Sequence, residues 1–280
     1  MRANPSADLF VVANSTGCTI YDFNGVVISS IPGGAEPVWT PGGTALLLSA
    51  PSNAGQTATV WLSKSQESFA IGPPTDRAYV DHPAGADGDA FYFVQSFSDD
   101  SSTEVHKTLF ADNSDTVIWS GKGRLSGHAV LTDAGVIFAA DRTFLRVNAS
   151  GDESKLDSNP FGNVYAPLRS PGGDGFSFIS GDHVIAADSQ QPGMGVSIPY
   201  SLDTGGGFAY SGGGTEIAIA TGDMVAIYSV DGSLEGHVSL SNGSRLVVVA
   251  WRTDGIEVVE NGDHPLLVLI PTNSIRSGSG

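Results

Sequence analysis

The feature that most constrains this chain is a tight turn that recurs about every 42 residues. The clearest copy is Trp39-Thr-Pro-Gly-Gly43, which is followed by the apolar run Ala45-Leu-Leu-Leu48. Six such turns, each followed by an apolar run, start at residues 39, 81, 131, 169, 210 and 251, so the steps are 42, 50, 38, 41 and 41 residues. Gly, Pro and Asp supply the backbone conformations that tight reversals need. A repeat of this length organises the whole chain.

Each repeat unit reads as four short strands. Residues 215–238 align with residues 8–31, and both read as a strand, a polar turn, a second strand, an Asp-containing turn and a third strand. Short apolar runs bounded by Gly, Pro, Asn, Asp and Ser recur from end to end, and helical periodicity is nearly absent. With the strand before the recurrent turn, a full unit is a four-stranded sheet.

Repeated four-stranded units of about 40 residues predict an all-β protein, a β-propeller. A lone sheet of this kind has two apolar faces, and packing sheets face to face around an axis buries both. A β-sandwich would not repeat at this step. We expect seven blades, with six as the alternative if the terminal strands merge into one blade. The first unit lacks its own first strand, and the last, residues 246–270, lacks a fourth. We expect one propeller domain over residues 1–274 and a linker or tag remnant over 275–280.

The turn sequences resemble those of known propeller families. Residues 31–43, Ile-Pro-Gly-Gly-Ala-Glu-Pro-Val-Trp-Thr-Pro-Gly-Gly, are similar to the TolB-like (WD40-like, PD40) repeat, whose pattern is Pro-x-Trp-Ser-Pro-Asp-Gly before an apolar strand. Residues 9–14, 19–22 and 27–32 resemble the YVTN-type repeat of surface-layer and exported propellers. Gly stands where the TolB-like pattern has Asp at positions 42, 172 and 213. The resemblance implies a propeller fold and leaves the function open.

Composition excludes some partners. Thirty acidic residues face thirteen basic ones, a net charge of −17, so we expect no nucleic-acid partner. No apolar run reaches the length of a membrane-spanning helix, and we expect no membrane insertion.

Cys18 is the single cysteine, which excludes an internal disulfide. An exported, cell-surface or virion-associated location is favoured over a cytoplasmic one, because an acidic surface suits a salty or extracellular setting. The oligomeric state stays open.

The sequence has no motif of catalysis or cofactor binding. The six His residues are scattered, without the close pairs or nearby Cys of a zinc site. Neither a nucleophile elbow nor a phosphate-binding loop occurs. We expect no cofactor, with Ca²⁺ as the alternative at Asp-rich turns, where turn chemistry is the simpler interpretation. These turns are Asp87-Gly-Asp89, Asp99-Asp100 with Glu104, Asp112 with Asp115, and Asp231 with Glu235.

Propellers bind partners through loops at one end of the ring. The connections between units share one end with the loops between second and third strands, and Arg and aromatic residues are enriched at binding hot spots. By location, we expect partner contacts from Arg77, Asp99, Asp100, Glu104, Arg124 and Phe161. The aromatic residues at the recurrent turns are expected to pack between units, and they are Trp39, Tyr210 and Trp251.

Two functions fit this architecture. We expect a non-enzymatic interaction module or scaffold that binds a protein or glycan partner through one loop face. The alternative is a propeller-type hydrolase or lyase with an axial carboxylate or metal site. Such an enzyme needs acids, Asn or His from several units to converge near the axis.

Overall fold

The computed structural model has most of its residues in β-strands and almost none in helices, which confirms the all-β class. It describes residues 2–4, 8–53, 55–72, 78–99, 101–200, 207–240, 245–261 and 266–277. Besides strands, these residues form a short 3₁₀ helix, Pro192–Met194, and helix α1, Thr272–Ser277. No helix within these ranges is long and apolar enough to cross a bilayer.

Twelve strands precede residue 123. They are β1 (Arg2–Ala3), β2 (Leu9–Asn14), β3 (Gly17–Asp22), β4 (Val27–Pro32), β5 (Ala35–Trp39), β6 (Ala45–Pro51), β7 (Gly55–Leu62), β8 (Ser68–Ala70), β9 (Tyr79–Ala86), β10 (Ala90–Phe97), β11 (Ser102–Leu109) and β12 (Asp115–Lys122). The first four form one antiparallel meander. The other eight form two meanders that share one sheet, because β7 pairs in parallel with Tyr79 and Val80 of β9.

Fifteen strands follow in the described residues. They are β13 (Val130–Thr132), β14 (Gly135–Ala140), β15 (Thr143–Val147), β16 (Glu153–Ser158), β17 (Tyr165–Arg169), β18 (Gly175–Ser180), β19 (His183–Asp188), β20 (Val196–Pro199), β21 (Phe208–Tyr210), β22 (Glu216–Thr221), β23 (Met224–Ser229), β24 (Leu234–Ser239), β25 (Arg245–Trp251), β26 (Ile256–Asn261) and β27 (Leu266–Ile270). They form three four-stranded meanders and then a sheet of β25, β26 and β27. In the described chain the last unit therefore has no fourth strand, as the sequence predicted.

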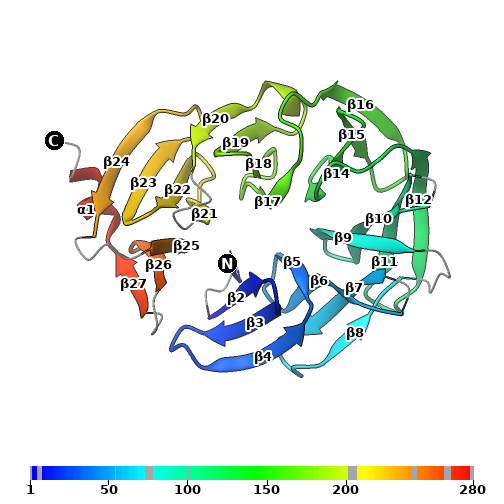
Figure 1. The fold of residues 1–280 in the computed structure, drawn as a ribbon, viewed down its shortest axis with the longest axis horizontal. Coiled ribbons are helices and arrows are strands. Elements are labelled where there is room, and N and C mark those ends of the chain that lie inside the picture. The colour runs from blue at the N-terminus through cyan, green and yellow to red at the C-terminus, as the bar shows by residue number, and fades with distance from the viewer. Residues whose placement is uncertain are drawn as a thin grey trace.

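The meanders are arranged around a central axis in chain order, as Figure 1 shows. Their first strands, such as β5, β9 and β17, lie innermost, and fourth strands such as β4 and β16 lie outermost. A second strand is covered on both faces by its neighbours, so consecutive apolar residues are buried there. Leu46, Leu47 and Leu48 of β6 are all fully buried. This explains the continuous apolar runs of the repeat.

Apolar clusters lie between neighbouring meanders. Tyr92 of β10 packs in one cluster with Phe138 of β14. Another cluster contains residues of the first and last sheets, because Phe10 of β2 packs with Val259 of β26 and Leu267 of β27. Faces that a lone sheet would expose are buried in this way, and apolar burial is the main stabilising contribution.

The predicted packing of the repeated aromatic residues is confirmed. Trp39 meets Trp61 edge-on, with 6.2 Å between ring centroids, in a cluster shared with β2 and β3. The Tyr210 hydroxyl lies 2.5 Å from the hydroxyl of Ser177 on the neighbouring sheet. Trp251 packs in the cluster between the last two sheets.

Three details differ from the sequence-based expectations. Residues 81–85 are not a turn but part of β9, and the turn comes at residues 87–89. The first unit has its own first strand, since β1 pairs with β2. Ile275, in the segment expected to be a linker, is fully buried in α1 against β23 and β24. The ordered fold therefore continues through α1.

Candidate functional site

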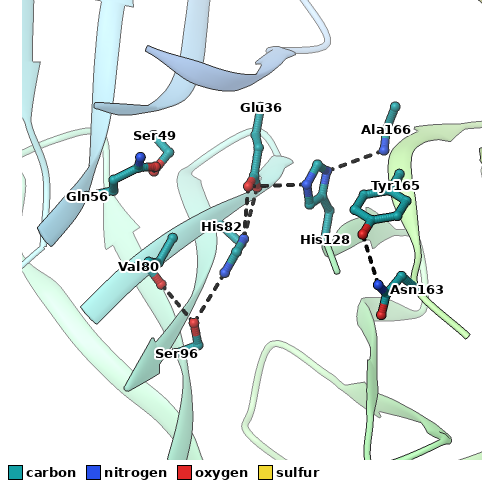
Figure 2. Close-up of polar contacts among 10 residues, drawn as sticks. All are labelled: Glu36, Ser49, Gln56, Val80, His82, Ser96, His128, Asn163, Tyr165 and Ala166. Atoms are coloured by element: carbon teal, nitrogen blue, oxygen red, sulfur yellow. Dashed lines mark hydrogen bonds and ion pairs between the residues drawn. The ribbon is translucent and has the colours of Figure 1, made fainter. Parts of the chain in front are cut away.

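Three ionisable side chains from different units meet near the axis. Glu36 lies on β5, His82 lies on β9, and His128 lies in the connection that leads from β12 to β13. Figure 2 shows the Glu36 carboxylate between the two imidazole rings. Successive members are 46 residues apart in the sequence. We call Glu36, His82 and His128 the axial cluster.

The Glu36 carboxylate is the shared acceptor of the cluster. His82 Nδ1 lies 3.0 Å from Glu36 Oε2 and 3.1 Å from Oε1, and His128 Nε2 lies 3.2 Å from Oε1. The side chains of Glu36, His82 and His128 are 13%, 14% and 21% exposed. Hydrogen bonds to an ionised acceptor at this depth are stronger than a solvated surface pair.

The remaining ring nitrogens are also bound by protein groups. His82 Nε2 lies 3.2 Å from Ser96 Oγ, which also lies 3.3 Å from the carbonyl oxygen of Val80. Both ring nitrogens of His82 are therefore within hydrogen-bond distance of a protein group. The backbone N–H of Ala166 donates to His128 Nδ1 at 3.3 Å. Nε2 of His128 consequently carries the proton that it donates to the carboxylate.

Two residues with strained backbone conformations both contact the imidazole of His128. Glu36 and Ala166 have φ angles of 54° and 44°, and both precede a proline on an inner strand. Left-handed backbone costs a residue with a side chain about 1–2 kcal/mol. A register shift in β5 and another in β17 cover the two positions. Both strained residues bond to His128, and strain of this kind concentrates at functional sites.

A cavity of about 290 Å³ lies beside the axial cluster. Glu36 and His128 line it together with apolar side chains from inner strands, such as Leu168 and Phe208. This volume is at the lower end of the range for small-molecule sites. Glu36 is the only carboxylate among the described residues that line it.

A larger groove opens on the loop face and shares His82 and His128 with the axial cluster. It has a volume of about 710 Å³, and Arg124, Tyr79 and Tyr165 also line it. A polar pocket of about 540 Å³ shares Arg124 with this groove. We call the two together the loop-face groove.

The segment 123–129 positions the groove. The N–H of Ser126 donates to the carbonyl of Ala139 at 2.8 Å, and the N–H of His128 donates to the carbonyl of Val164 at 2.7 Å. These bonds fasten the segment to the meander of β13–β16 and to the approach of β17. The connection therefore leads from the outer edge of one sheet to the axis along a fixed path.

The predicted partner-contact residues are only partly described. Arg77 and Asp100 lie outside the described residues. Asp99 is exposed in the loop between β10 and β11. Arg124 is exposed and lines both parts of the loop-face groove.

Glu104 and Phe161 do not line the groove. Glu104 Oε2 lies 3.4 Å from Nε2 of His106, a fully buried ring whose Nδ1 bonds to Asp115 at 2.8 Å. Phe161 packs edge-on against Phe178 with 5.7 Å between centroids. The set of six contact residues stays a prediction.

Sequence reasoning missed the axial cluster, because no two of the His residues are close in the sequence. A signal was present: Glu36 and His82 each directly precede a proline, and His128 follows His82 at the same step of 46 residues. Proline at equivalent positions of a repeat marks equivalent backbone geometry. Aligning the units on those prolines places Glu36 and His82 at one position, and a further step of 46 residues adds His128.

A buried carboxylate near the cluster has a structural role. Asp81 is 1% exposed and accepts hydrogen bonds of 2.8 Å from the N–H of Ala58 and from Gln95 Nε2. Burial raises the pKa of Asp81 to about 6, against the opposing effect of these bonds. Since Ala58 belongs to β7 and Asp81 to β9, the carboxylate links two meanders.

Two of the Asp-rich turns, at Asp87 and Asp231, show the predicted turn chemistry, and Asp100 lies outside the described residues. Asp87 Oδ1 accepts from the N–H groups of Asp89 and Ala90 at 2.9 and 2.8 Å. Asp231 Oδ1 accepts from the N–H of Ser233 at 3.0 Å. No group of three or more His, Cys, Asp and Glu in the described ranges is placed to hold a metal ion. The Ca²⁺ alternative stays a prediction.

No protein-family model matches the sequence, and no curated protein matches it. Solved structures do resemble the fold. An oligogalacturonate lyase in complex with manganese matches with a TM-score of 0.62 over 97% of this chain and 88% of its own, at 12% identity. The β-propeller domain of Cps50 (Swd1) from Myceliophteria thermophila matches with a TM-score of 0.60 over 96% of both chains, at 13% identity.

TolB from Acinetobacter baumannii matches with a TM-score of 0.56 over 84% of this chain and 64% of its own, at 17% identity. Identities this low show the fold alone. The chain is a β-propeller, and its fold fits the TolB-like and WD40-like propellers.

Proposed function

We propose that the chain forms a ring of seven blades. The eight-stranded sheet divides into two meanders, β5–β8 and β9–β12, which with the other five sheets make seven units. The first and last units share the cluster of Phe10, Val259 and Leu267. The last unit has three strands in the described chain. In this proposal the ring is therefore closed by packing the face of the last sheet against the face of the first, and not by one sheet that contains strands from both ends of the chain.

We further propose that this ring is a non-enzymatic binding module that engages a protein or glycan partner through the loop face. One observation carries the proposal: all four ring nitrogens of the axial cluster are bound by protein groups. A general base or a metal ligand needs a free lone pair within reach of its substrate or ion. The guanidinium of Arg124, in contrast, is exposed at the groove.

Charge supports the choice of partner. A chain with a net charge of −17 repels the phosphates of nucleic acids. A protein or glycan that meets the loop face locally is not subject to this limit, because salt screens charges more than about 8 Å apart at physiological ionic strength. An exported or cell-surface setting, which the acidic surface suits, would offer such partners.

Capture from the native source tests the loop face. The test variant combines Asp99→Arg with Arg124→Glu, which reverses two exposed charges on the loop face. The matched control is Lys64→Glu, an exposed charge in the turn between β7 and β8, at the opposite end of the blade. We expect the test variant to lose the partner that the wild type and the control both retain. Equal loss in both variants, or in neither, would overturn the proposal.

The enzymatic alternative has one observation in its favour. Glu36 is a carboxylate beside an axial cavity, and a structural neighbour is a lyase in complex with manganese. Activity would require His128 or His82 to break one of its hydrogen bonds to the protein, so that a ring nitrogen becomes free for substrate or metal. We would measure unsaturated product from uronic acid oligosaccharides, with and without Mn²⁺ or Ca²⁺, and metal binding by calorimetry. Activity lost in Glu36→Gln and kept in Lys64→Glu would replace the binding proposal with the enzymatic one.

A further inference from the structure

Two arginines on the loop face differ from the others. Six arginine side chains are described, and four of them have a side-chain partner. The four pairs are Arg146 with Gln190, Arg169 with Asp133, Arg252 with Glu257, and Arg276 with Glu216. Arg124 and Arg142 have no side-chain partner among the described residues. In a chain with 30 acidic residues, this leaves two guanidinium groups available on one face.

Both of these arginines line the same polar pocket, of about 540 Å³. The backbone holds them there: the N–H of Asp141 donates to the carbonyl of Arg124 at 3.2 Å, and Asp141 Oδ1 accepts the N–H of Arg124 at 3.1 Å. Arg142 has a φ of 66° in the two-residue turn between β14 and β15, and Asp141 has 45°. That turn type is dominated by Gly, Asn and Asp, so an arginine there is unusual.

The pocket is positive despite the acidic chain. Among the described residues, Asp141 is the one acid that lines it, and its carboxylate is engaged by the N–H of Arg124. Asn163 and Ser126 add an amide and a hydroxyl to the lining. A guanidinium pair with neutral hydrogen-bonding neighbours is suited to a carboxylate, which accepts two parallel N–H donors from each fork.

The adjoining part of the groove favours a sugar over a peptide. Tyr165 is 44% exposed, lines the groove, and accepts a hydrogen bond of 2.8 Å from Asn163 Nδ2. An exposed ring fixed by a neighbour provides a flat apolar surface beside polar groups, to which a pyranose can stack. Ser98 and Ser102 add hydroxyl groups to the lining, whereas the Tyr79 hydroxyl bonds to Thr57. A protein hot spot places its Arg and aromatic side chains in a fully desolvated pocket, whereas Tyr165 and Arg124 are exposed.

We propose that the loop-face groove binds a glycan that carries a carboxylate sugar. Arg124 and Arg142 bind the carboxylate, and the neighbouring sugar stacks on Tyr165. This proposal rests on the proposed binding function and names the ligand class for the same face. Sugar carboxylates are spaced far more widely than duplex phosphates, which follow every ~1.7 Å of helix axis, so the acidic chain tolerates them better.

The test uses the full chain and a panel of hyaluronan, alginate, polygalacturonate and a sialylated oligosaccharide, each paired with its carboxyl-reduced form. Binding is measured by calorimetry at physiological ionic strength. We expect at least one acidic glycan to bind and its carboxyl-reduced form to bind at least tenfold more weakly. Arg124→Ala and Arg142→Ala should each weaken binding about 10- to 100-fold, Arg142→Lys less, and Lys64→Glu not at all. Tyr165→Ala should weaken it, and Tyr165→Phe should leave most of it.

Three results would overturn the proposal: no acidic glycan binds, the reduced forms bind equally well, or the arginine variants bind like the wild type. A polyglutamate peptide that binds better than every glycan would assign the pocket to an acidic protein instead. Equal thermal midpoints of the variants confirm that each is folded. Loss of the native partner in the capture experiment with no glycan binding would refute the ligand class and leave the binding function standing.

Discussion

Replacing Glu36 and His128 separately and together measures the contact on which the axial cluster depends. Glu36 Oε1 lies 3.2 Å from His128 Nε2, and both side chains are at least three-quarters buried. A hydrogen bond to a charged group contributes about 1.5–3 kcal/mol, and partial exposure places this one near or below the low end, at about 1–1.5 kcal/mol. His128→Ala also leaves the N–H of Ala166 without its acceptor, which adds about 1 kcal/mol.

We therefore expect His128→Ala to lower the free energy of unfolding by about 2–3 kcal/mol. The double-mutant cycle of Glu36→Ala and His128→Ala should give a coupling energy of about 1–1.5 kcal/mol. Urea unfolding followed by tryptophan fluorescence measures all four proteins.

The control is a second cycle, on Asp182 and His183. These two side chains form an ion pair of 2.6 Å but are 82% and 42% exposed. Their coupling should be within about 0.5 kcal/mol of zero, as for other surface pairs. A coupling below about 0.3 kcal/mol between Glu36 and His128 would refute the reasoning, because it would equal the error of additivity for unconnected sites.

Three further predictions concern buried groups. The pKa of Asp81 is about 6, above its value near 3.8 in the unfolded chain. The free energy of unfolding of the wild type should therefore fall by up to about 3 kcal/mol as the pH rises from 4 to 6, and urea unfolding of Asp81→Asn should lack that fall. Burial raises the pKa of the Cys18 thiol to about 11, so a maleimide should modify it at least ~100-fold more slowly in the native protein than in urea; rates within tenfold would contradict this. Tyr210→Phe should cost about 1–2 kcal/mol, because it leaves the buried Ser177 hydroxyl without a partner, and adding Ser177→Ala should recover part of the loss in a thermal scan.

The repeat could be predicted from the sequence because its causes are local. Gly and Pro determine the turns locally, and the apolar runs between them mark the strands. The same pattern predicted that the described part of the last unit has no fourth strand. The one misplaced turn, residues 81–85, contains Pro83, which normally argues against a strand interior. Pro83 is tolerated in β9 because it pairs with Phe93 of β10 and has no second neighbouring strand there. A sequence does not show which strands are innermost.

The candidate site was harder to predict because it depends on how units meet. Arg124 was selected by its place in a connection between units, and the structure puts it at the groove. Arg142 was not selected, because nothing in the sequence of its two-residue turn indicates that its guanidinium is exposed in the same pocket as Arg124. His82 and His128 come together through packing between units, so their proximity shows only when units are compared and not within one unit.

Both the prolines and the axial cluster follow from one property of the inner strands. An inner strand has a neighbour on one side, so a proline there removes no hydrogen bond that the sheet needs. The same freedom permits the bulges at Glu36 and Ala166, which turn the preceding backbone toward the axis. A repeat places this position of each unit at the axis. The side chain at that position therefore decides which chemical groups line the axis: a carboxylate at Glu36, an imidazole at His82 and a methyl at Ala166. Exchanging residues at that one position should therefore change the chemistry of the axis while the fold, which depends on the second and third strands, is retained.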